Sequence, residues 1–310
     1  MTSNANNDFT HIDSAGRAKM VDVSSKIATF RRAVAYGVIK TGKNAYSKLV
    51  ENSLAKGDAF AVSRIAGIMA AKKTSELIPL THPLGLNSVH VHFAPIADDR
   101  IAVFSDVRTD DRTGVEMEAM TSVSVAMLNL YDMVKAVEKG AEIITTKLLF
   151  KDGGKSGRYT AEGVEIGKIE KLAISPGKGT PKEPIDKCQL ITEFGLKDDA
   201  HAGKWHRQVS LLAIESVEKM RSKGLDVTFG SFAENICTSG LTLYELPIGS
   251  LMLVGEGTIM QITQIGKECH TKCAVYHRAG DCVMPREGIF TRVLTGGEVS
   301  TGDQIIVIRT

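Results

Sequence analysis

Apolar residues follow two different periods in the first half of the chain. Val89, Val91 and Phe93 alternate with polar residues, which is the two-residue period of a half-buried strand. Further along, apolar residues recur every three or four positions, as they do on the buried face of a helix. They are Met117, Met120, Val123, Met127, Leu130 and Val134. We predict one long helix here that ends at Gly140.

The predicted elements of the first half follow the order strand, helix, strand, strand, helix, strand. The first helix begins at Asp58, whose carboxylate can cap the free amide groups. The other ranges are strands over 31–40, 89–93, 101–108 and 143–150, with the first helix over 58–73. This order is typical of a ferredoxin-like α+β sandwich. Helices would cover one face of the sheet, so we expect the other face to favour self-association.

The second half has a different pattern, with many short apolar runs separated by glycine and proline. Strands are predicted over 165–174, 208–212, 251–254, 258–265 and 304–308, with one helix over 215–223. Many short strands with few helices favour a mostly-β barrel. The polar, glycine-rich stretch 151–157 precedes this change of pattern. We therefore predict two domains, 1–161 and 162–310.

Composition narrows the kinds of partner. The chain has 310 residues and a net charge of +2, and its charged residues are spread throughout. Nucleic-acid and membrane binders concentrate basic residues on one surface, so a small-molecule substrate is expected instead. No secretory signal and no apolar run of the roughly 20 residues needed to cross a bilayer is visible. The sequence therefore predicts a cytoplasmic protein.

Asp132 and Lys135 are the first candidates for chemistry, because residues three apart on a helix have neighbouring side chains. An isolated pair of this kind is most often a surface ion pair. Here Tyr131, Met133 and Val134 surround it, which indicates partial burial. Burial shifts a lysine toward its neutral form, in which it can accept a proton. The pattern therefore favours an acid/base site over a solvated ion pair.

Four further residues could join this site. Lys56 precedes a predicted helix N-terminus, where an anion finds free amide groups. His82 is held extended by Pro83, although a histidine in this setting is more often a loop residue. Glu116 and Glu118 stand at the entrance of the long helix. Each of these residues also has a solvent-exposed interpretation, which the sequence leaves open.

Residues 9 to 157 resemble the MoaC-type cyclic pyranopterin monophosphate synthases of molybdenum cofactor biosynthesis. The matching segments run in order and without large gaps. They are Met20-Val21-Asp22-Val23, Lys56-Gly57-Asp58, Ile65-Ala66-Gly67-Ile68, Leu77-Ile78-Pro79-Leu80-Thr81-His82-Pro83-Leu84, Thr113-Gly114-Val115-Glu116-Met117-Glu118-Ala119, Tyr131-Asp132-Met133 and Gly153-Gly154-Lys155-Ser156-Gly157.

The resemblance implies a reaction and a set of roles. A cyclised dihydroguanosine triphosphate would be rearranged to cyclic pyranopterin monophosphate with release of pyrophosphate, in a hexamer whose sites lie between subunits. Proton transfer would fall to Lys56, Asp132 and Lys135. The substrate would be bound by Leu80, Thr81, His82, Glu116, Met117, Glu118 and Lys151. No cofactor would be required for this step and no metal-binding residue is predicted, although the sequence leaves open whether a divalent ion accompanies the triphosphate. Ring opening and closing requires proton donors and acceptors.

All five cysteines lie in the second half, and three of them belong to one polar cluster. Cys269-His270-Thr271-Lys272-Cys273 is followed by His277 and Cys282. A structural zinc site and ordinary reduced cysteines are both possible. A reactive thiol is favoured, because Lys267, Lys272 and Arg278 lie close in sequence and positive charge stabilises a thiolate.

Residues 164 to 310 resemble MOSC domains, the molybdenum cofactor sulfurase C-terminal type. The matching segments are Asp198-Asp199-Ala200-His201-Ala202-Gly203, Arg207-Gln208-Val209-Ser210-Leu211-Leu212, Phe232-Ala233-Glu234-Asn235-Ile236, Gly249-Ser250 and Gly266-Lys267-Glu268-Cys269 through Cys273. The resemblance implies a β-barrel that binds the molybdenum-pterin cofactor or carries sulfur as a persulfide. Cys273 best matches the family's thiol, with Cys269 as the alternative.

Two hypotheses follow for the whole chain. In the first, the N-terminal half is a competent, pyrophosphate-releasing synthase fused to a later cofactor-handling module. In the second, it is a non-catalytic pterin-binding scaffold, and the C-terminal module supplies the function. Every motif position of the synthase pattern is filled, which favours the enzyme.

Overall fold

The computed structural model describes residues 15–177, 182–267, 276 and 282–309. The chain divides into two compact units, Met1–Ala161 and Glu162–Thr310. Each unit has its own hydrophobic core, built around Val103 and Met127 in the first and around Leu211 and Met260 in the second. None of the described helices is long and apolar enough to cross a membrane.

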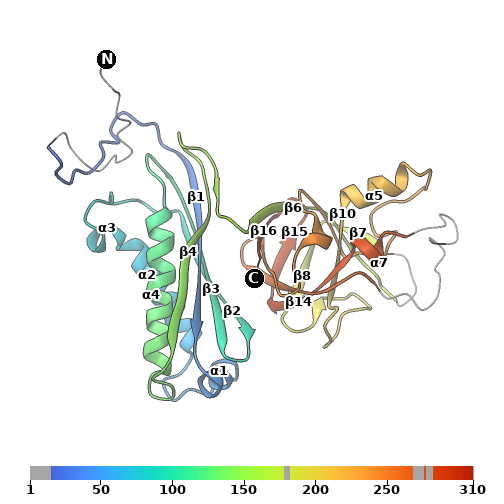
Figure 1. Ribbon diagram of the computed structural model, residues 1–310, viewed down its shortest axis with the longest axis horizontal. Coiled ribbons are helices and arrows are strands. Elements are labelled where there is room, and N and C mark those ends of the chain that lie inside the picture. The colour runs from blue at the N-terminus through green and yellow to red at the C-terminus, as the bar shows by residue number, and fades with distance from the viewer. Residues whose placement is uncertain (1–14, 178–181, 268–275, 277–281, 310) are drawn as a thin grey trace. The chain divides into compact units, whose positions relative to one another are not determined.

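The N-terminal unit is built on one antiparallel sheet (Figure 1). Its spatial order is β2-β3-β1-β4-β5, and Tyr36 of β1 lies opposite Phe104 of β3 and Lys147 of β4. The strands are β1 (Thr29–Lys40), β2 (Ser88–Ala97), β3 (Arg100–Asp111), β4 (Glu142–Asp152) and β5 (Tyr159–Thr160). The four long strands have the order of a ferredoxin-like sandwich, which confirms the predicted fold class.

Two long helices pack on one face of this sheet, α2 (Ala59–Lys72) and α4 (Glu116–Val134). Asp58 caps α2 as predicted, because its carboxylate accepts the Ala61 N–H at 2.9 Å. The predicted end of α4 at Gly140 was wrong. After Val134 the chain continues in turns, and Val137 N–H donates to the Val134 carbonyl at 2.8 Å. The short helices α1 (Lys43–Val50) and α3 (Thr74–Leu77) were not predicted.

The helices α2 and α4 run antiparallel and touch along their length. Near one end the Ser63 hydroxyl is 3.0 Å from Asn129 Oδ1. Farther along, Gly67 packs so closely that a Cβ atom there would lie 3.0 Å from the Ser122 carbonyl oxygen. This close approach fixes the start of α2 beside the end of α4, which brings Lys56 to Asp132.

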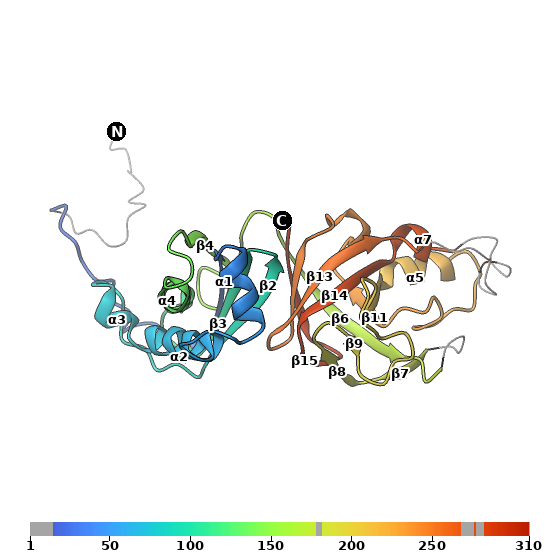
Figure 2. The ribbon, with the colours of Figure 1, turned by 90° about the horizontal axis from the view of Figure 1, so that it is seen from below.

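The C-terminal unit contains a closed barrel, as predicted. Its seven strands follow the order β6-β11-β10-β14-β13-β12-β16, and β16 pairs again with β6 (Figure 2). They are β6 (Val164–Ile174), β10 (Val209–Ala213), β11 (Ile236–Ser239), β12 (Leu251–Val254), β13 (Thr258–Ile265), β14 (Ile289–Thr295) and β16 (Gln304–Ile308). Closure leaves no free edge among these strands.

Shorter elements surround the barrel. The strand β7 (Glu183–Ile185) pairs antiparallel with the end of β6. A separate three-stranded sheet is formed by β15 (Gly297–Ser300), β8 (Lys187–Ile191) and β9 (Gly195–Leu196). The helices are α5 (Ile214–Arg221), α7 (Met284–Glu287) and a single 3₁₀ turn, η1 (Leu243–Glu245). Both α5 and α7 contact β10, and they bury a second apolar cluster that includes Val217 and Met284.

Candidate functional site

The three predicted proton-transfer residues meet at the C-terminal end of α4. Asp132 lies between two ammonium groups, with its Oδ2 3.0 Å from Lys56 Nζ and its Oδ1 2.6 Å from Lys135 Nζ. Lys56 Nζ also donates to the Asp132 carbonyl at 2.6 Å. The sequence predicted the Asp132–Lys135 pair from its spacing, whereas Lys56 arrives through the antiparallel packing of α2 on α4. We call these three residues the lysine–aspartate cluster.

The electrostatics of this cluster differ from the prediction. The side chains of Lys56, Asp132 and Lys135 are 42%, 51% and 53% exposed within one chain, and this partial burial does not shift Lys135 toward its neutral form. Hydrogen bonds from Lys135 and then Lys56 lower the pKa of Asp132, and the same contact raises the pKa of Lys135. An isolated chain therefore holds Asp132 as an anion and Lys135 as a cation at neutral pH.

A second group of predicted residues meets at the opposite end of α4. Lys151 of β4 places its Nζ 2.9 Å from Glu116 Oε1 and 2.9 Å from the Ser156 hydroxyl. The Glu116 carboxylate folds back over Gly114, where any Cβ would collide with it. A larger residue at this position would displace the Glu116 carboxylate from where it meets Lys151.

Glu118 is the one buried carboxyl of this second group, with 4% of its surface exposed. Burial, followed by the nearby charge of Glu116, raises its pKa to about 7. A carboxyl with this pKa exchanges a proton readily at neutral pH. The sequence suggested a substrate contact here but gave no sign of the shifted pKa, because the burial of Glu118 depends on the tertiary fold.

The predicted segment 80–82 lies at the same end of the unit as Glu116. It follows α3, and the Thr81 hydroxyl donates to the Ile78 carbonyl at 2.9 Å. The chain after His82 is tied to the end of β3, where Asn87 donates to Asp110 Oδ2 at 2.6 Å. Leu80, Thr81 and His82 are half-buried, whereas Met117 is 41% exposed. Residues 80–82, Glu116, Met117, Glu118 and Lys151 form what we call the glutamate cluster.

One chain does not bring the two clusters together. They lie at opposite ends of α4, and at about 1.5 Å per residue the stretch from Glu118 to Asp132 separates them by roughly 20 Å. Within one copy the two lysines and the aspartate converge, but the segment of His82 lies at the other end of α4, so a site that joins all four groups stays a prediction that needs an adjoining copy. Either cluster could act alone, or a second copy could bring its own end of α4 to the first.

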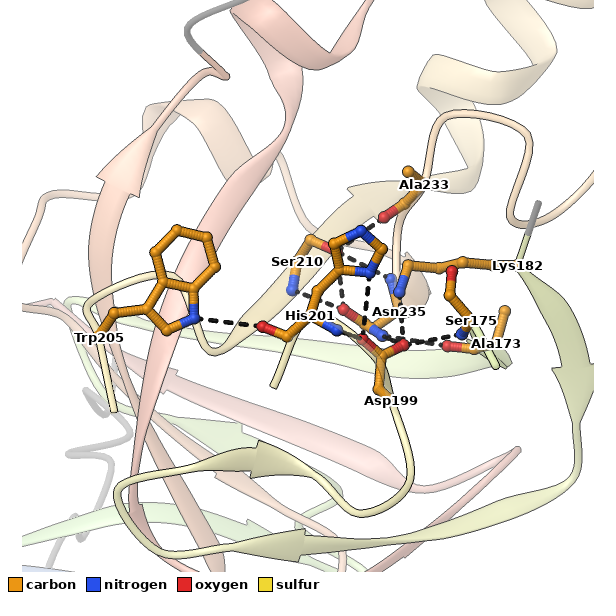
Figure 3. A network of polar contacts seen from close by, with 9 residues as sticks. All are labelled: Ala173, Ser175, Lys182, Asp199, His201, Trp205, Ser210, Ala233 and Asn235. Atoms are coloured by element: carbon orange, nitrogen blue, oxygen red, sulfur yellow. Dashed lines mark hydrogen bonds and ion pairs between the residues drawn. The ribbon is translucent and has the colours of Figure 1, made fainter. Parts of the chain in front are cut away.

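The C-terminal unit contains a buried polar network centred on Asp199 (Figure 3). The Asp199 carboxylate accepts hydrogen bonds from Lys182 Nζ at 2.6 Å and from Asn235 Nδ2 at 2.9 Å. It also accepts the backbone N–H groups of Ser175 and His201, each at 2.9 Å. Asn235 is bound in turn by the Ser210 hydroxyl at 2.9 Å. Strands β6, β10 and β11 are thus linked to the loop that follows β9.

Charge in this network is balanced within the unit. The side chains of Lys182 and Asp199 are each 2% exposed. Burial would raise the pKa of Asp199, but the hydrogen bonds from Lys182 and the two backbone amides outweigh it and hold this pKa low. His201 Nδ1 lies 3.5 Å from Asp199 Oδ1, and burial together with the Lys182 charge lowers the pKa of its imidazole. Asp199 is therefore held as a carboxylate and the imidazole is neutral at pH 7, while burial lowers the pKa of Lys182 from its ordinary value.

The two candidate thiols, Cys273 and Cys269, lie outside the described residues. Among the described cysteines, burial raises the pKa of Cys188 to about 12 and also raises the pKa of Cys237. Neither would form a thiolate readily. In the described part of the chain, no group of three or more His, Cys, Asp or Glu side chains is arranged to hold a metal ion.

Sequence reasoning gave no role to the residues of the Asp199 network. Asp199, His201 and Asn235 fall in segments that carry the MOSC resemblance, so the signal was present for them. Lys182 lies in a proline-rich connection with no recognisable motif. Its pairing with Asp199 depends on the tertiary fold.

Comparison with known proteins assigns both units. The sequence pattern of the MoaC family matches residues 20–154, and that of the MOSC domain matches residues 198–306. A protein of Cereibacter sphaeroides strain KD131 named cyclic pyranopterin monophosphate synthase is 52% identical over 154 residues, which are 49% of this chain and 97% of that protein. One of the same name from Dinoroseobacter shibae is 49% identical over 155 residues, 50% of this chain and 98% of that protein.

Among solved structures, the YUAD protein of Bacillus subtilis is similar to part of the chain. It is 21% identical, with a TM-score of 0.42, and the match covers 47% of this chain and 98% of that one.

Proposed function

The chain belongs to the MoaC family and carries a MOSC domain beyond its MoaC unit, and from this we propose that it is a cyclic pyranopterin monophosphate synthase joined to a module that handles the molybdenum-pterin cofactor. The first unit acts on a cyclised dihydroguanosine triphosphate, which it converts to cyclic pyranopterin monophosphate with release of pyrophosphate. The identity over nearly the full length of the named synthases supports this assignment.

The observation that carries the chemistry is the position of Asp132 between Lys56 and Lys135. Opening and closing rings near neutral pH requires groups that give and take protons in place. A carboxylate held by two ammonium groups can pass a proton in either direction once the cluster is covered and its charges are desolvated. In an isolated chain these side chains are half-exposed, so a covering surface or the substrate must supply the desolvation.

The glutamate cluster supplies a complementary set of groups. Glu118 is half-ionised at neutral pH because its pKa is about 7, so it can act as an acid or a base. Lys151 offers a cation to the phosphate chain of the substrate when Glu116 releases it. In this proposal Leu80 to His82, together with Met117, contact the body of the substrate.

A complete site then needs both clusters, and their separation along α4 means that they come from two copies. The resemblance to the family implied a hexamer with sites between subunits, and this geometry supports an intersubunit site. The hexameric state and a cytoplasmic location stay predictions.

The synthase activity is tested by incubating the purified full chain with the cyclised triphosphate and measuring pyrophosphate. We expect release by the wild type, and a loss of about a hundredfold or more for Lys56→Ala and Asp132→Asn, as is typical when a proton-transfer group is removed. Lys72→Ala removes an exposed lysine from the last turn of α2 and serves as the matched control. No pyrophosphate from the wild type would exclude the enzyme, and full activity in both variants would exclude their roles.

For the second unit, the proposal is that it binds the pterin cofactor or carries sulfur on Cys273 or Cys269. Mass spectrometry after incubation with a sulfur donor distinguishes these two alternatives. A persulfide adds the mass of one sulfur atom, and Cys273→Ser and Cys269→Ser identify the thiol that accepts it. An unchanged mass together with bound zinc would overturn the sulfur-carrying alternative in favour of a structural metal site.

A further inference from the structure

The loop from Lys197 to Gln208 is fixed at both ends. At its start the Asp199 carboxylate is held by the network described above, and Ala200 N–H donates to the Ser175 carbonyl at 2.9 Å. At its end Gln208 N–H donates to the Thr291 carbonyl at 3.0 Å, and Gln208 Oε1 accepts the Val293 N–H at 2.8 Å. Side chains on this loop are therefore presented from a rigid base.

Within the loop, aromatic rings hold the Arg207 side chain in place. Its Cζ atom lies 4.7 Å from the centre of the Trp205 ring and 5.6 Å from that of Phe290. Phe290 is buried on β14, and the Trp205 indole N–H donates to the His201 carbonyl at 3.2 Å (Figure 3). Contacts of a guanidinium with two rings restrict the orientation of its plane.

The guanidinium of Arg207 has no polar partner among the described residues. Its Nε is shielded from solvent and makes no hydrogen bond. The two terminal nitrogens make no hydrogen bond or ion pair with the described residues either, and they are not among the shielded unpaired atoms, so they face solvent. Fixing a guanidinium costs conformational entropy and hydration, and among the described residues only the two ring contacts offset that cost. An anionic ligand would add to this offset.

The charged residues of the loop itself also favour an anion. Lys182 neutralises Asp199, which leaves Asp198 as the remaining carboxylate of the loop. The basic residues of the same loop are Lys197, Lys204 and Arg207. A rigid, planar fork without a polar partner among the described residues, on a loop with more basic than acidic residues, matches the geometry of an oxyanion that accepts two parallel hydrogen bonds.

We propose that Arg207 is the phosphate receptor of the C-terminal unit and that it binds a phosphate monoester through its two terminal nitrogens. Trp205 is a positioning residue that holds the guanidinium plane. The inference deepens the proposed cofactor-handling role and rests on it for the organic part of the ligand. The phosphate itself is argued from the loop.

The chain offers a probe that lies on this loop. Trp205 is its single tryptophan, and it lies against Arg207, so its fluorescence reports on binding beside that residue. We would titrate the full chain with inorganic phosphate, with phenyl phosphate and with phenol. A saturable change is expected for the two phosphates and none for phenol. No saturable change with either phosphate would overturn the proposal.

Three variants separate a specific receptor from general electrostatics. Arg207→Gln should weaken phenyl phosphate binding about tenfold or more, and Arg207→Lys should fall between, because lysine keeps the charge but loses the fork. Lys204→Gln removes one exposed charge from the same loop and should change the affinity by less than about twofold. Equal losses of phenyl phosphate affinity in Arg207→Gln and Lys204→Gln would contradict the proposal.

Thermal unfolding followed by Trp205 fluorescence shows whether each variant retains its fold. If Arg207→Gln unfolds, Arg207→Lys still tests the proposal, because a lysine keeps much of the packing against the two rings. Unphosphorylated pterin separates this inference from the proposed function. If pterin quenches Trp205 saturably and phosphate binding is unaffected by Arg207→Gln, the cofactor role stands and the receptor fails. If phosphates bind through Arg207 and pterin does not bind, the receptor stands and the pterin assignment loses its support.

Discussion

Glu118 illustrates how a single residue acquires its chemistry from its place in the fold. It stands in the first turn of α4, where the helix dipole favours a carboxylate. Its burial works in the opposite direction by raising the pKa, and the adjacent charge of Glu116 adds to that effect. The effect of burial on the pKa is larger than that of the helix dipole, so Glu118 stays protonated up to about pH 7. The neighbouring Glu116 is half-exposed and is paired with Lys151.

Glu118 should make the N-terminal unit less stable as the pH rises. Its pKa is about 7 in the folded chain against an ordinary value of 4.5, so between these values the unfolded chain loses the proton first and is stabilised relative to the folded one. Glu118→Gln removes this penalty. We expect it to match the wild type near pH 5 and to exceed it by about 2 to 3 kcal/mol near pH 8.

Hydrogen exchange of the α4 backbone amides, measured from pH 5 to 8 and corrected for intrinsic rates, checks this for the N-terminal unit alone. Glu142→Gln changes an exposed carboxyl at the start of β4 and serves as the control. A difference between Glu118→Gln and the wild type that stays constant across this range would show that Glu118 does not titrate as argued.

At the scale of elements, the crossing of α2 and α4 positions the lysine–aspartate cluster. Gly67 is buried at that crossing, and a Cβ there would lie 3.0 Å from the Ser122 carbonyl oxygen and 3.1 Å from the Ala126 Cβ. Glycine in a helix interior costs roughly 1 kcal/mol relative to alanine. Gly67 permits a close approach of α2 to α4, and this approach places Lys56 beside Asp132. The lower intrinsic stability of α2 is therefore offset by the geometry that it gives to the site.

Gly67→Val should separate the two helices. Its branched side chain would press against the backbone of α4, which cannot move aside as a flexible side chain could, and we expect a destabilisation of about 1 to 3 kcal/mol. Pyrophosphate release per folded molecule should also fall, because Lys56 moves away from Asp132. Lys72→Val places the same side chain on the exposed last turn of α2 and controls for helix propensity. Unchanged activity in Gly67→Val would show that the close crossing of α2 and α4 is not needed for the activity of the site.

The elements that the sequence predicted are those with a regular apolar period. β2 and α4 show such a period along the chain, whereas β3 is buried on both faces and alternates only in part. β14 was missed because it is buried on both sides, with Ile289, Phe290, Val293 and Leu294 all inside, and such a strand does not alternate. The short strands β7, β8 and β9 have too few residues to show a period, and their pairing partners decide their conformation.

At the scale of the whole molecule, the sequence predicted which residues form each cluster but not that the two lie apart. The Asp132–Lys135 pair follows from helix spacing, and Lys56 follows from the family motif. The distance between Glu118 and Asp132 is set by the length of α4. Whether another copy closes that gap depends on an assembly that the pattern of one chain does not describe. Lys182 was missed for a similar reason, because only the folded barrel brings it to Asp199.

Complementation between inactive chains tests the two-copy site. One chain carries Lys56→Ala, and the other carries Glu118→Gln with Lys151→Ala. If each site takes one cluster from each of two copies, then in a random mixture of equal amounts a site draws an intact cluster of each kind with a chance of one half times one half. About a quarter of the wild-type pyrophosphate release should therefore return on co-expression.

The matched control mixes Lys56→Ala with Asp132→Asn. Both changes damage the lysine–aspartate cluster, so every site in that mixture keeps a defective one, and no activity should return. The contrast between the two mixtures separates a shared site from a general effect of assembly on stability. If neither mixture recovers activity while mixed oligomers are shown to form, the two ends of α4 do not serve one site, and one cluster must act with groups from its own chain.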